Sequence, residues 1–344
     1  MTSLPDGTEK GRRPRNFLLV FLGLGLGLGI AEAGLRLFGA GLFDRWIIIR
    51  HATPLPNRVT TQYHLTDYGY ALNCDGTEGC NAFGGPVWGY KPAKAAGVYR
   101  ILILGDSLTE QVPVAWEHPA YLVWAQYLEK ALSSRGRYEL LNGALVGFNL
   151  PHYLGYLRAR IRETKPDLVV VSFCLNDVDR CSFVEMGGKI TMIHSDLKVP
   201  FFADLFRISK LFQYIVLSLV GPSAGVKSIP PDRILAMLRE MKTLAADRIA
   251  AVVFPPFTET EAYSPAERRK YEMITSGLKE AGIDYFEVRS CFRGYGPRIR
   301  DFRRDQGDPL HFNRAAHELS ARAIYPWLTR MIAKFPADAP RRSP

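Results

Sequence analysis

The sequence predicts an α/β fold, with a parallel sheet covered by helices on both faces, behind an N-terminal transmembrane helix. Short apolar runs without polar alternation are typical of strands buried on both faces. Five such runs occur, at 100–104, 139–142, 168–173, 249–254 and 283–288. Helical stretches lie between them, near 119–135, 151–164, 231–247 and 265–282. This alternation of strands and helices favours a parallel sheet.

The N-terminal stretch has the composition of a membrane span. Residues 17–31 carry no charge, and the apolar character continues to about Phe38, interrupted only by Glu32 and Arg36. A span needs roughly 20 apolar residues, so 17–38 is long enough. Glu32 and Arg36 are four residues apart on one helical face, so we expect them to pair near the outer interface. Basic residues that keep the preceding end in the cytoplasm are Lys10, Arg12, Arg13 and Arg15.

A cleaved signal peptide is the alternative, because Ala31-Glu32-Ala33 has the small-x-small form of a cleavage site. We favour the uncleaved anchor, and both interpretations export the rest of the chain. The predicted location is the cell inner membrane, with a single pass and the main domain on the periplasmic, extracytoplasmic side.

The chain divides into four segments. Residues 1–45 are the basic cytoplasmic tail and anchor (or signal peptide), 46–98 a juxtamembrane collar, 99–332 the α/β domain and 333–344 a disordered tail. An insertion at 178–230 interrupts the domain. It contains the apolar stretch 210–221, which is too short to cross a bilayer. We expect this stretch to form a helix that covers the domain or contributes to a lid near the active site.

The 344 residues carry a formal net charge of +10, from 44 Lys and Arg against 34 Asp and Glu. This balance is compatible with nucleic acid, anionic lipid or acidic polysaccharide. Because the sequence has no zinc-finger spacing, heptad repeat or aromatic RNA-binding pattern, we expect no nucleic-acid partner. Six arginines form either a basic rim for an anionic glycan or lipid headgroup, or a solvated face paired with Asp301 and Asp305. They are Arg289, Arg293, Arg298, Arg300, Arg303 and Arg304.

The five cysteines fit an exported chain. Cys74 and Cys80 flank a polar turn, which in an oxidising compartment favours a small disulfide-closed loop. A zinc site is the weaker interpretation, because no second Cys or His pair stands nearby. Cys174 and Cys181 are a second candidate pair, and Cys291 is then expected to be buried and inert.

Ser107 follows the first predicted strand, in Gly105-Asp106-Ser107-Leu108. Ligands of doubly wound sheets bind at the carboxyl ends of the strands, so this position suits a nucleophile. The stretch is not the strained elbow of α/β-hydrolases, which reads Gly-x-Ser-x-Gly. A structural or phosphate-contacting serine is the alternative.

Asp308 and His311 lie in the loop before the last helix, for which Asn313 is a plausible N-cap. A loop fixed by the start of a helix can hold both side chains toward one cleft. The carboxylate can then accept from one imidazole nitrogen while the other nitrogen faces the serine. The alternative is a surface turn with an incidental histidine.

Donors for an oxyanion are found in the loops after the next two strands. Gly147 can approach a substrate closely because it has no Cβ, and the side-chain amide of Asn176 is a neutral donor. Together with the backbone N–H of Ser107 they could surround a developing oxyanion. Taken singly, Gly147 could be a turn glycine and Asn176 a helix cap.

This set of residues resembles the SGNH (GDSL-type) hydrolase family over about residues 99–332. The four blocks are Gly105-Asp106-Ser107-Leu108, Gly147, Asn176-Asp177 and Asp308-x-x-His311. The resemblance implies a flavodoxin-like three-layer α/β/α sandwich with a five-stranded parallel sheet. It also implies Ser107 as nucleophile, His311 as general base, Asp308 as the residue that orients it, and an oxyanion hole of Ser107, Gly147 and Asn176. It implies no cofactor and no metal.

Two positions depart from the family pattern. Cys174 replaces the glycine of the usual Gly-x-Asn-Asp block, which would displace Asn176 if the backbone needed a positive φ there. Gln111 stands where a glycine often follows the first block, which bears on the shape of the pocket.

The resemblance predicts a serine esterase that acts on an acylated carbohydrate or other ester through an acyl-serine intermediate. The anchor ending in Glu-Ala-Gly-Leu-Arg also resembles a group of bacterial, membrane-anchored members, some of which act on envelope polysaccharides. Two alternatives keep the same fold: an O-acyltransferase that uses the same triad, and a non-catalytic anchored protein for polysaccharide binding or assembly. A phosphate binder that uses residues 106–109 would leave Asp308 and His311 unexplained.

Overall fold

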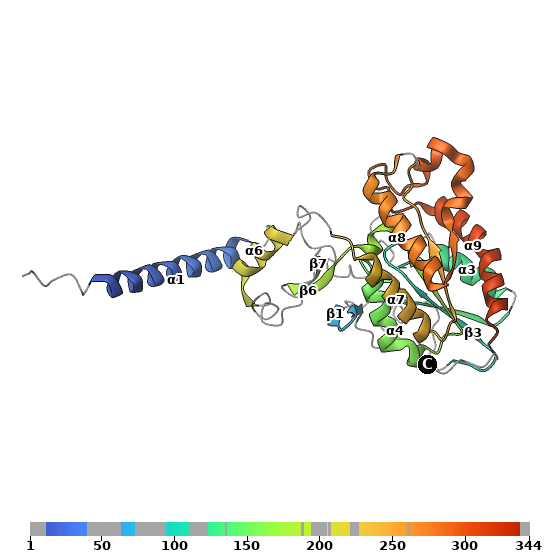
Figure 1. Cartoon of the computed structure of the whole chain (residues 1–344), viewed down its shortest axis with the longest axis horizontal. Helices are drawn as coiled ribbons and strands as arrows, with labels where there is room; N and C mark the ends of the chain where they lie inside the picture. The colour runs from blue at the N-terminus through green and yellow to red at the C-terminus, as the bar shows by residue number, and fades with distance from the viewer. Residues whose placement is uncertain are drawn as a thin grey trace, which may run out of the picture.

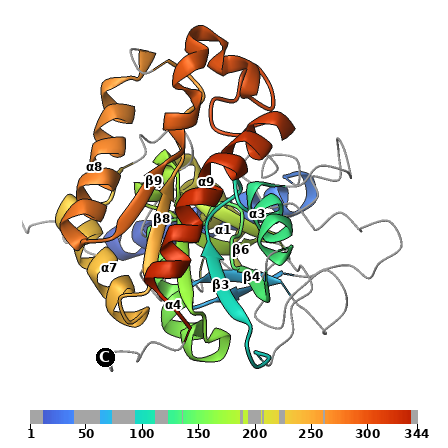
Figure 2. The same cartoon turned by 90° about the vertical axis from the view of Figure 1, so that its right-hand side faces the viewer.

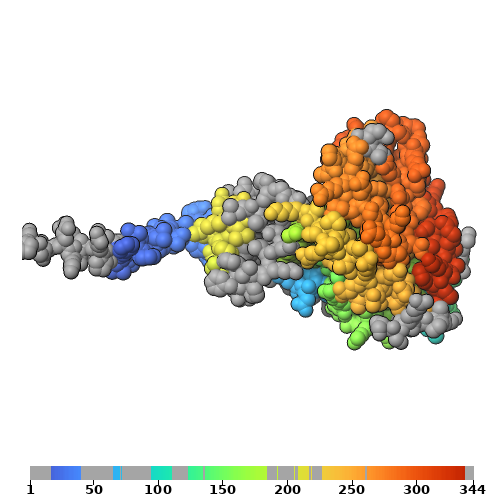
Figure 3. Space-filling model, viewed as in Figure 1, coloured from blue at the N-terminus to red at the C-terminus, as the bar shows by residue number. Residues whose placement is uncertain are grey.

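The computed structural model describes residues 12–39, 63–72, 94–110, 123–134, 136–186, 189–193, 205, 208–220, 227–259 and 262–337. One long helix, α1 (Arg12–Phe38), lies at one end of an elongated molecule and a rounded α/β domain lies at the other (Figure 1 and Figure 3). Three predictions fall outside the described residues: the Cys74–Cys80 loop, the effect of Gln111 and the tail from 338 onward.

Helix α1 contains the predicted span. Residues Phe17–Phe38 form an apolar stretch of 22 residues, none of which is fully buried by the described part of the chain, and no other helix in the described ranges is as long and apolar. At 1.5 Å per residue the stretch covers about 33 Å, enough for the hydrocarbon core of a bilayer. Its length and composition are those of a membrane anchor or a signal sequence.

The predicted parallel sheet is confirmed. Its strands are β3 (Tyr99–Leu104), β4 (Tyr138–Asn142), β5 (Leu168–Phe173), β8 (Ile249–Val253) and β9 (Asp284–Glu287). They lie in the order β4-β3-β5-β8-β9, and every neighbouring pair is parallel. Counted along this sheet alone, the order is 2-1-3-4-5, which is the flavodoxin-like order.

Helices cover both faces of the sheet, as Figure 2 shows. Three of them, α4 (Leu150–Thr164), α7 (Pro231–Leu244) and α8 (Pro265–Ala281), pack on one face against Leu102, Leu104 and their neighbours. The helices α3 (Trp124–Ser133) and α9 (Arg314–Lys334) pack on the other face, against Ile101 and Ile103. Successive strand residues point to opposite faces, so an uninterrupted apolar strand contributes side chains to the hydrophobic core on each face of the sheet.

The collar contains a hairpin that the sequence analysis missed. Strands β1 (Tyr63–Thr66) and β2 (Gly69–Leu72) pair antiparallel around a tight turn. Tyr68 in that turn is buried against α4, where a Cβ on Gly155 would lie 2.7 Å from the Cβ of Tyr68. The Asp-Tyr-Gly turn between two runs of β-forming residues was the available signal.

The insertion begins with an antiparallel hairpin, β6 (Ser182–Met186) and β7 (Lys189–Ile193), and continues to helix α6 (Lys210–Val220). The predicted helix is confirmed, but its predicted place is wrong. It does not cover the α/β domain; it lies beside the end of α1, away from the sheet (Figure 1). Polar contacts from α1 to the start of α6, described below, account for this position.

Two further predictions are corrected. Cys174 and Cys181 do not form a disulfide; each keeps its thiol and bonds a different partner. The domain also extends beyond residue 332, because α9 continues to Lys334 and the chain after it is held in place. The hydroxyl of Tyr99 donates to the carbonyl of Phe335 at 2.7 Å, and Arg248 donates to the carbonyl of Pro336 at 2.9 Å.

Candidate active site

Ser107 lies in the turn that leaves the carboxyl end of β3. The amides of Thr109 and Glu110 both donate to the carbonyl of Asp106, which closes the turn around the serine. A Cβ on Gly105 would lie only 2.6 Å from Oγ1 of Thr109, so the turn is this tight because residue 105 is glycine. The Ser107 side chain is half-buried at the surface of this turn.

The loop between the 3₁₀ segment η4 (Val288–Phe302) and α9 brings His311 to Ser107. The Oγ of Ser107 lies 2.7 Å from Nε2 of His311, although the residues are 204 positions apart in sequence. The Nδ1 of His311 lies 2.6 Å from Oδ2 of Asp308. Asn313 caps α9 through a 3.1 Å bond from the amide of Ala316, as predicted, and so fixes the end of this loop.

Asp308 is held as a carboxylate by several donors. Its Oδ1 accepts from the amides of Leu310 at 2.9 Å and His311 at 3.1 Å. Partial burial favours the neutral acid, but these amides and the His311 ring outweigh it, so the pKa of Asp308 lies below its usual value. The guanidinium of Arg304 also donates to Oδ2, at 3.1 Å.

The Gly147 loop is fastened to the serine turn by three hydrogen bonds. Leu145 donates its amide to the carbonyl of Gly105 at 3.1 Å, and the Asn142 side chain donates to the carbonyl of Thr109 at 2.9 Å. The amide of Val146 donates to Oε2 of Glu110 at 2.6 Å. The two loops therefore form one rigid unit at the edge of the sheet.

Gly147 itself has a φ of +74°, and a Cβ there would meet Sδ of Met192 at 2.9 Å. Both facts require glycine at this position. Within the described part of the chain, neither the N–H of Ser107 nor that of Gly147 donates to a protein acceptor. Two backbone donors on one rigid unit are thus available to a ligand.

Asn176 lies in the short 3₁₀ turn η2 (Leu175–Val178) after β5, next to Asp106. Its Nδ2 is 3.4 Å from Oδ2 of Asp106, the residue next to Ser107. The doubt raised by Cys174 is resolved, because this residue has φ of −130° and ψ of 177°, an extended conformation that any residue adopts. Cys174 therefore does not displace Asn176.

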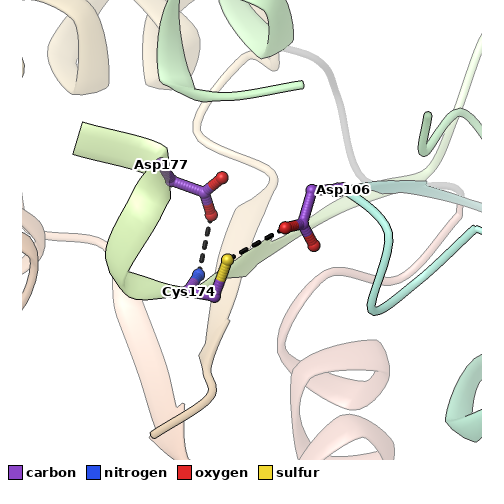
Figure 4. Close-up of side chains that lie close together, drawn as sticks. All are labelled: Asp106, Cys174 and Asp177. Atoms are coloured by element: carbon purple, nitrogen blue, oxygen red, sulfur yellow. Dashed lines mark hydrogen bonds between the residues drawn. The ribbon is translucent and has the colours of Figure 1, made fainter. Parts of the chain in front are cut away.

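Cys174 instead connects two buried carboxylates, as Figure 4 shows. Its Sγ lies 3.0 Å from Oδ2 of Asp106 and 2.6 Å from Oδ1 of Asn176, so either oxygen can accept its one S–H, and its amide donates to Oδ2 of Asp177 at 2.7 Å. The hydroxyl of Tyr153 donates to the other oxygen of Asp177 at 2.8 Å. The network links the third block to the serine turn.

The three groups Asp106, Cys174 and Asp177 are close enough together to suggest a metal site. Their chemistry does not fit one, because burial, and secondarily the charge of Asp106, raise the pKa values of Cys174 and Asp177 well above normal. A metal requires the thiolate and the carboxylate, whereas this environment favours their protonated forms. We therefore assign the cluster to hydrogen bonding.

The arginine-rich segment is mostly engaged within the protein. Arg300 pairs with Glu259 at 2.9 Å, and Arg303 donates to the carbonyl of Phe257 at 2.6 Å. Arg289 lies 5.2 Å from the centre of the Tyr263 ring. Of the predicted partners, Asp305 lies 3.9 Å from Arg304. These contacts favour a structural face over a free basic rim.

Two residues of the site were missed from the sequence. Glu110 is 5% exposed and holds the Gly147 loop by accepting a hydrogen bond from the amide of Val146. Arg304 donates to the carboxylate of Asp308. Burial raises the pKa of Glu110 to about 8. The charge of Asp106 adds to this rise, and the hydrogen bond from the Val146 amide opposes it. Arg304 stands four residues before Asp308 in a charged run, and no sequence pattern separates it from the other arginines there.

A flavodoxin-like sandwich that joins a serine, a histidine and an aspartate at the carboxyl edge of its sheet defines a class of serine hydrolases. The family model described as "GDSL-like Lipase/Acylhydrolase family" matches residues 103–319. The chain belongs to this family, and the predicted SGNH (GDSL-type) assignment is confirmed. A search of curated proteins found no match.

Several solved structures resemble the α/β domain. A lipase/acylhydrolase from Enterococcus faecalis is 16% identical, with 67% of this chain and 96% of that chain covered and a TM-score of 0.41. An acetylxylan esterase from Geobacillus stearothermophilus is 14% identical, with 68% and 94% covered and a TM-score of 0.42. The esterase EstA from Pseudoalteromonas sp. is 16% identical, with 68% and 98% covered and a TM-score of 0.41.

Proposed function

We propose that the protein is a membrane-anchored serine esterase whose nucleophile is Ser107. The observation that carries the proposal is the hydrogen-bonded chain from Ser107 through His311 to Asp308, at 2.7 Å and 2.6 Å. A serine that caps a helix or contacts phosphate does not require an imidazole within hydrogen-bond distance. A nucleophilic serine does, and it also requires a carboxylate that orients the imidazole.

In the proposed reaction, Nε2 of His311 takes the proton of Ser107 as its Oγ attacks an ester carbonyl. The amides of Ser107 and Gly147 and the side chain of Asn176 hold the oxyanion, and each such donor is typically worth about 3 kcal/mol. The tetrahedral intermediate collapses to an acyl-serine while His311 protonates the leaving alcohol. Water, activated by the same His311, then releases the acid and regenerates the serine.

The proposed substrate is an O-acyl ester of an envelope carbohydrate, because the anchor holds the enzyme at the extracytoplasmic face of the inner membrane. A sugar hydroxyl that replaces water in the second half-reaction would make the same site an O-acyltransferase. Partition of the acyl group between water and an added oligosaccharide acceptor, measured by mass spectrometry, separates the two reactions.

The test uses the full-length chain in detergent. We expect turnover of p-nitrophenyl acetate and covalent labelling of Ser107 by a fluorophosphonate. The variant Ser107→Ala should lose at least about 10³-fold in turnover and all labelling while keeping its melting temperature. Ser290→Ala is the matched control, since Ser290 is exposed and its hydroxyl bonds only the carbonyl of Glu287 in the described chain.

A wild-type protein that is folded, and yet neither turns over small esters nor reacts with the fluorophosphonate, would contradict the esterase proposal. It would favour the anchored polysaccharide-binding alternative. Equal turnover by wild type and Ser107→Ala would exclude this serine as the nucleophile.

A further inference from the structure

The outer end of α1 is joined to the start of α6 by a set of polar contacts that we call the anchor clamp. It consists of Glu32, Arg36 and residues 208–211. Oε1 of Glu32 accepts from the amide of Lys210 at 3.0 Å, and Oε2 accepts from the amide of Leu211 at 2.8 Å and the hydroxyl of Ser209 at 2.9 Å. Arg36 donates to the carbonyl of Ile208 at 2.5 Å and to Glu32 at 2.7 Å.

The anchor clamp provides hydrogen-bond partners for backbone amides and charged side chains that would be unfavourable, if unpaired, in an apolar environment. The first amides of a helix have no partner within the helix. A carboxylate at that end can accept from them, and its negative charge also interacts favourably with the helix dipole. Here the carboxylate comes from another helix, 178 positions earlier in the sequence than Lys210. The predicted pairing of Glu32 with Arg36 is confirmed, and both side chains also bind the insertion.

The position of the anchor clamp places α6 at the bilayer. Glu32 lies within the span Phe17–Phe38, six residues before its outer end, or about 9 Å along the helix axis. Residues 208–211 bond directly to Glu32 and Arg36, so the start of α6 shares this depth. With 11 residues, α6 is about 16 Å long, too short to cross a hydrocarbon core of about 30 Å.

Exposed apolar side chains occur on α6 and just before it. Outside α1, the large hydrophobic side chains that are exposed in the described chain are Leu65, Ile208 and Ile215. Ile215 lies in α6, and Ile208 lies two residues before its start. Their exposed fractions are 44% and 60%. Exposed apolar residues beside a membrane span are typical of a helix that lies in the interface plane.

We propose that α6 is a second membrane contact, which lies in the outer interface of the bilayer and is held there by the anchor clamp. This inference rests on the proposed membrane anchoring by α1. The same insertion also carries the hairpin β6–β7, which precedes α6 and whose Phe183 and Met192 lie beside Gly147. The insertion therefore contacts both α1 and the Gly147 loop.

The test is photochemical labelling of the full-length protein in vesicles of phosphatidylethanolamine and phosphatidylglycerol. The vesicles contain a phospholipid with a diazirine near the glycerol end of its acyl chain, and labelled peptides are identified by mass spectrometry. We expect label on peptides of α1 and on those that contain residues 208–216. Label on α1 alone would overturn this inference and leave the esterase and anchor proposals intact, whereas no label on either helix would overturn the anchor as well.

Two variants sharpen the test. Glu32→Ala should remove most of the label from α6 while α1 stays labelled, because the amides of Lys210 and Leu211 lose their acceptor. Ile215→Asp should also lose most of the α6 label, whereas the matched control Leu65→Asp, on the β1 hairpin, should keep it. Turnover of a soluble ester should be unchanged in Ile215→Asp. Equal α6 labelling in wild type and Ile215→Asp would contradict the proposed contact.

Discussion

Asp308 accepts hydrogen bonds from more groups than the Asp308-x-x-His311 motif predicts. Its Oδ2 accepts both Nδ1 of His311 at 2.6 Å and the guanidinium of Arg304 at 3.1 Å. Arg304 also donates its amide to the carbonyl of His311 at 2.9 Å. Arg304 therefore contacts the proposed triad at the side chain of Asp308 and the backbone of His311, and we expect it to act as a positioning residue.

We expect Arg304→Gln to lower kcat for p-nitrophenyl acetate by up to about tenfold, the scale of one hydrogen bond to a charged group, with little change in KM. The matched control is Arg300→Gln, because Arg300 lies in the same segment and pairs with Glu259 instead. Equal kcat values for the two variants would rule out a positioning role for Arg304.

Glu110 couples stability to pH. Folding raises its pKa from 4.5 to about 8, so the folded protein holds the proton more tightly than the unfolded chain. The stability that this contributes is fully present below about pH 4.5 and is lost as the pH rises towards 8. Glu110→Gln should therefore gain in unfolding free energy over wild type between these values, by up to about 1.4 kcal/mol per pH unit.

Thermal unfolding of wild type and Glu110→Gln in detergent, from pH 5 to pH 8, measures this difference. The control is Glu280→Gln, because Glu280 is exposed on α8. A melting-temperature difference between wild type and Glu110→Gln that does not change with pH would show that Glu110 is ionised in the folded protein throughout.

At the level of elements, the active site depends on two loops that behave as one. The serine turn after β3 and the Gly147 loop after β4 are joined by the bonds to Gly105, Thr109 and Glu110. The hairpin β6–β7 closes over the second loop, so a change there affects both stability and turnover.

Gly147→Ala tests this arrangement. A Cβ at φ +74° would meet Sδ of Met192 at 2.9 Å, so the left-handed conformation, at about 1–2 kcal/mol, and a shift of the hairpin both oppose the substitution. Alanine keeps the backbone N–H, but this strain shifts it away from the oxyanion. We expect a lower melting temperature and a fall in kcat of about 10²-fold, the scale of one oxyanion donor. Gly294→Ala is the control, because its Cβ would meet nothing within 4 Å; a Gly147→Ala variant with a lower melting temperature and wild-type kcat would show that the strain does not displace an oxyanion donor.

Elements that follow local periodicity were the easiest to predict from the sequence. Where the structure describes them, the five strands and the helices between them were predicted within a few residues, and the approach of His311 to Ser107 was implied by their positions after strands and by the family resemblance. The roles proposed for these residues stay predictions. The hairpin β1–β2 and the place of α6 depended on contacts between segments far apart in sequence, which periodicity does not encode.

On the scale of the whole molecule, the basic N-terminal residues and the single span predict one orientation. The α/β domain should face the extracytoplasmic side, since Lys and Arg beside a span are retained in the cytoplasm. In spheroplasts, added protease should digest the domain and spare an N-terminal tag until the membrane is opened with detergent. A domain that resists protease while the tag is cleaved would reverse the predicted orientation.

The anchor clamp also bears on how this enzyme can be handled. Deleting the first 38 residues is the usual route to a water-soluble version of a single-pass protein, but here it would remove the acceptor for the amides of Lys210 and Leu211. Helix α6 would keep only the Ser209 hydroxyl as its cap, bonded to the amide of Phe212. With Ile208 and Ile215 exposed to water, such a preparation would tend to self-associate. A well-behaved soluble form therefore requires trimming the chain in two places, at its beginning and within the insertion.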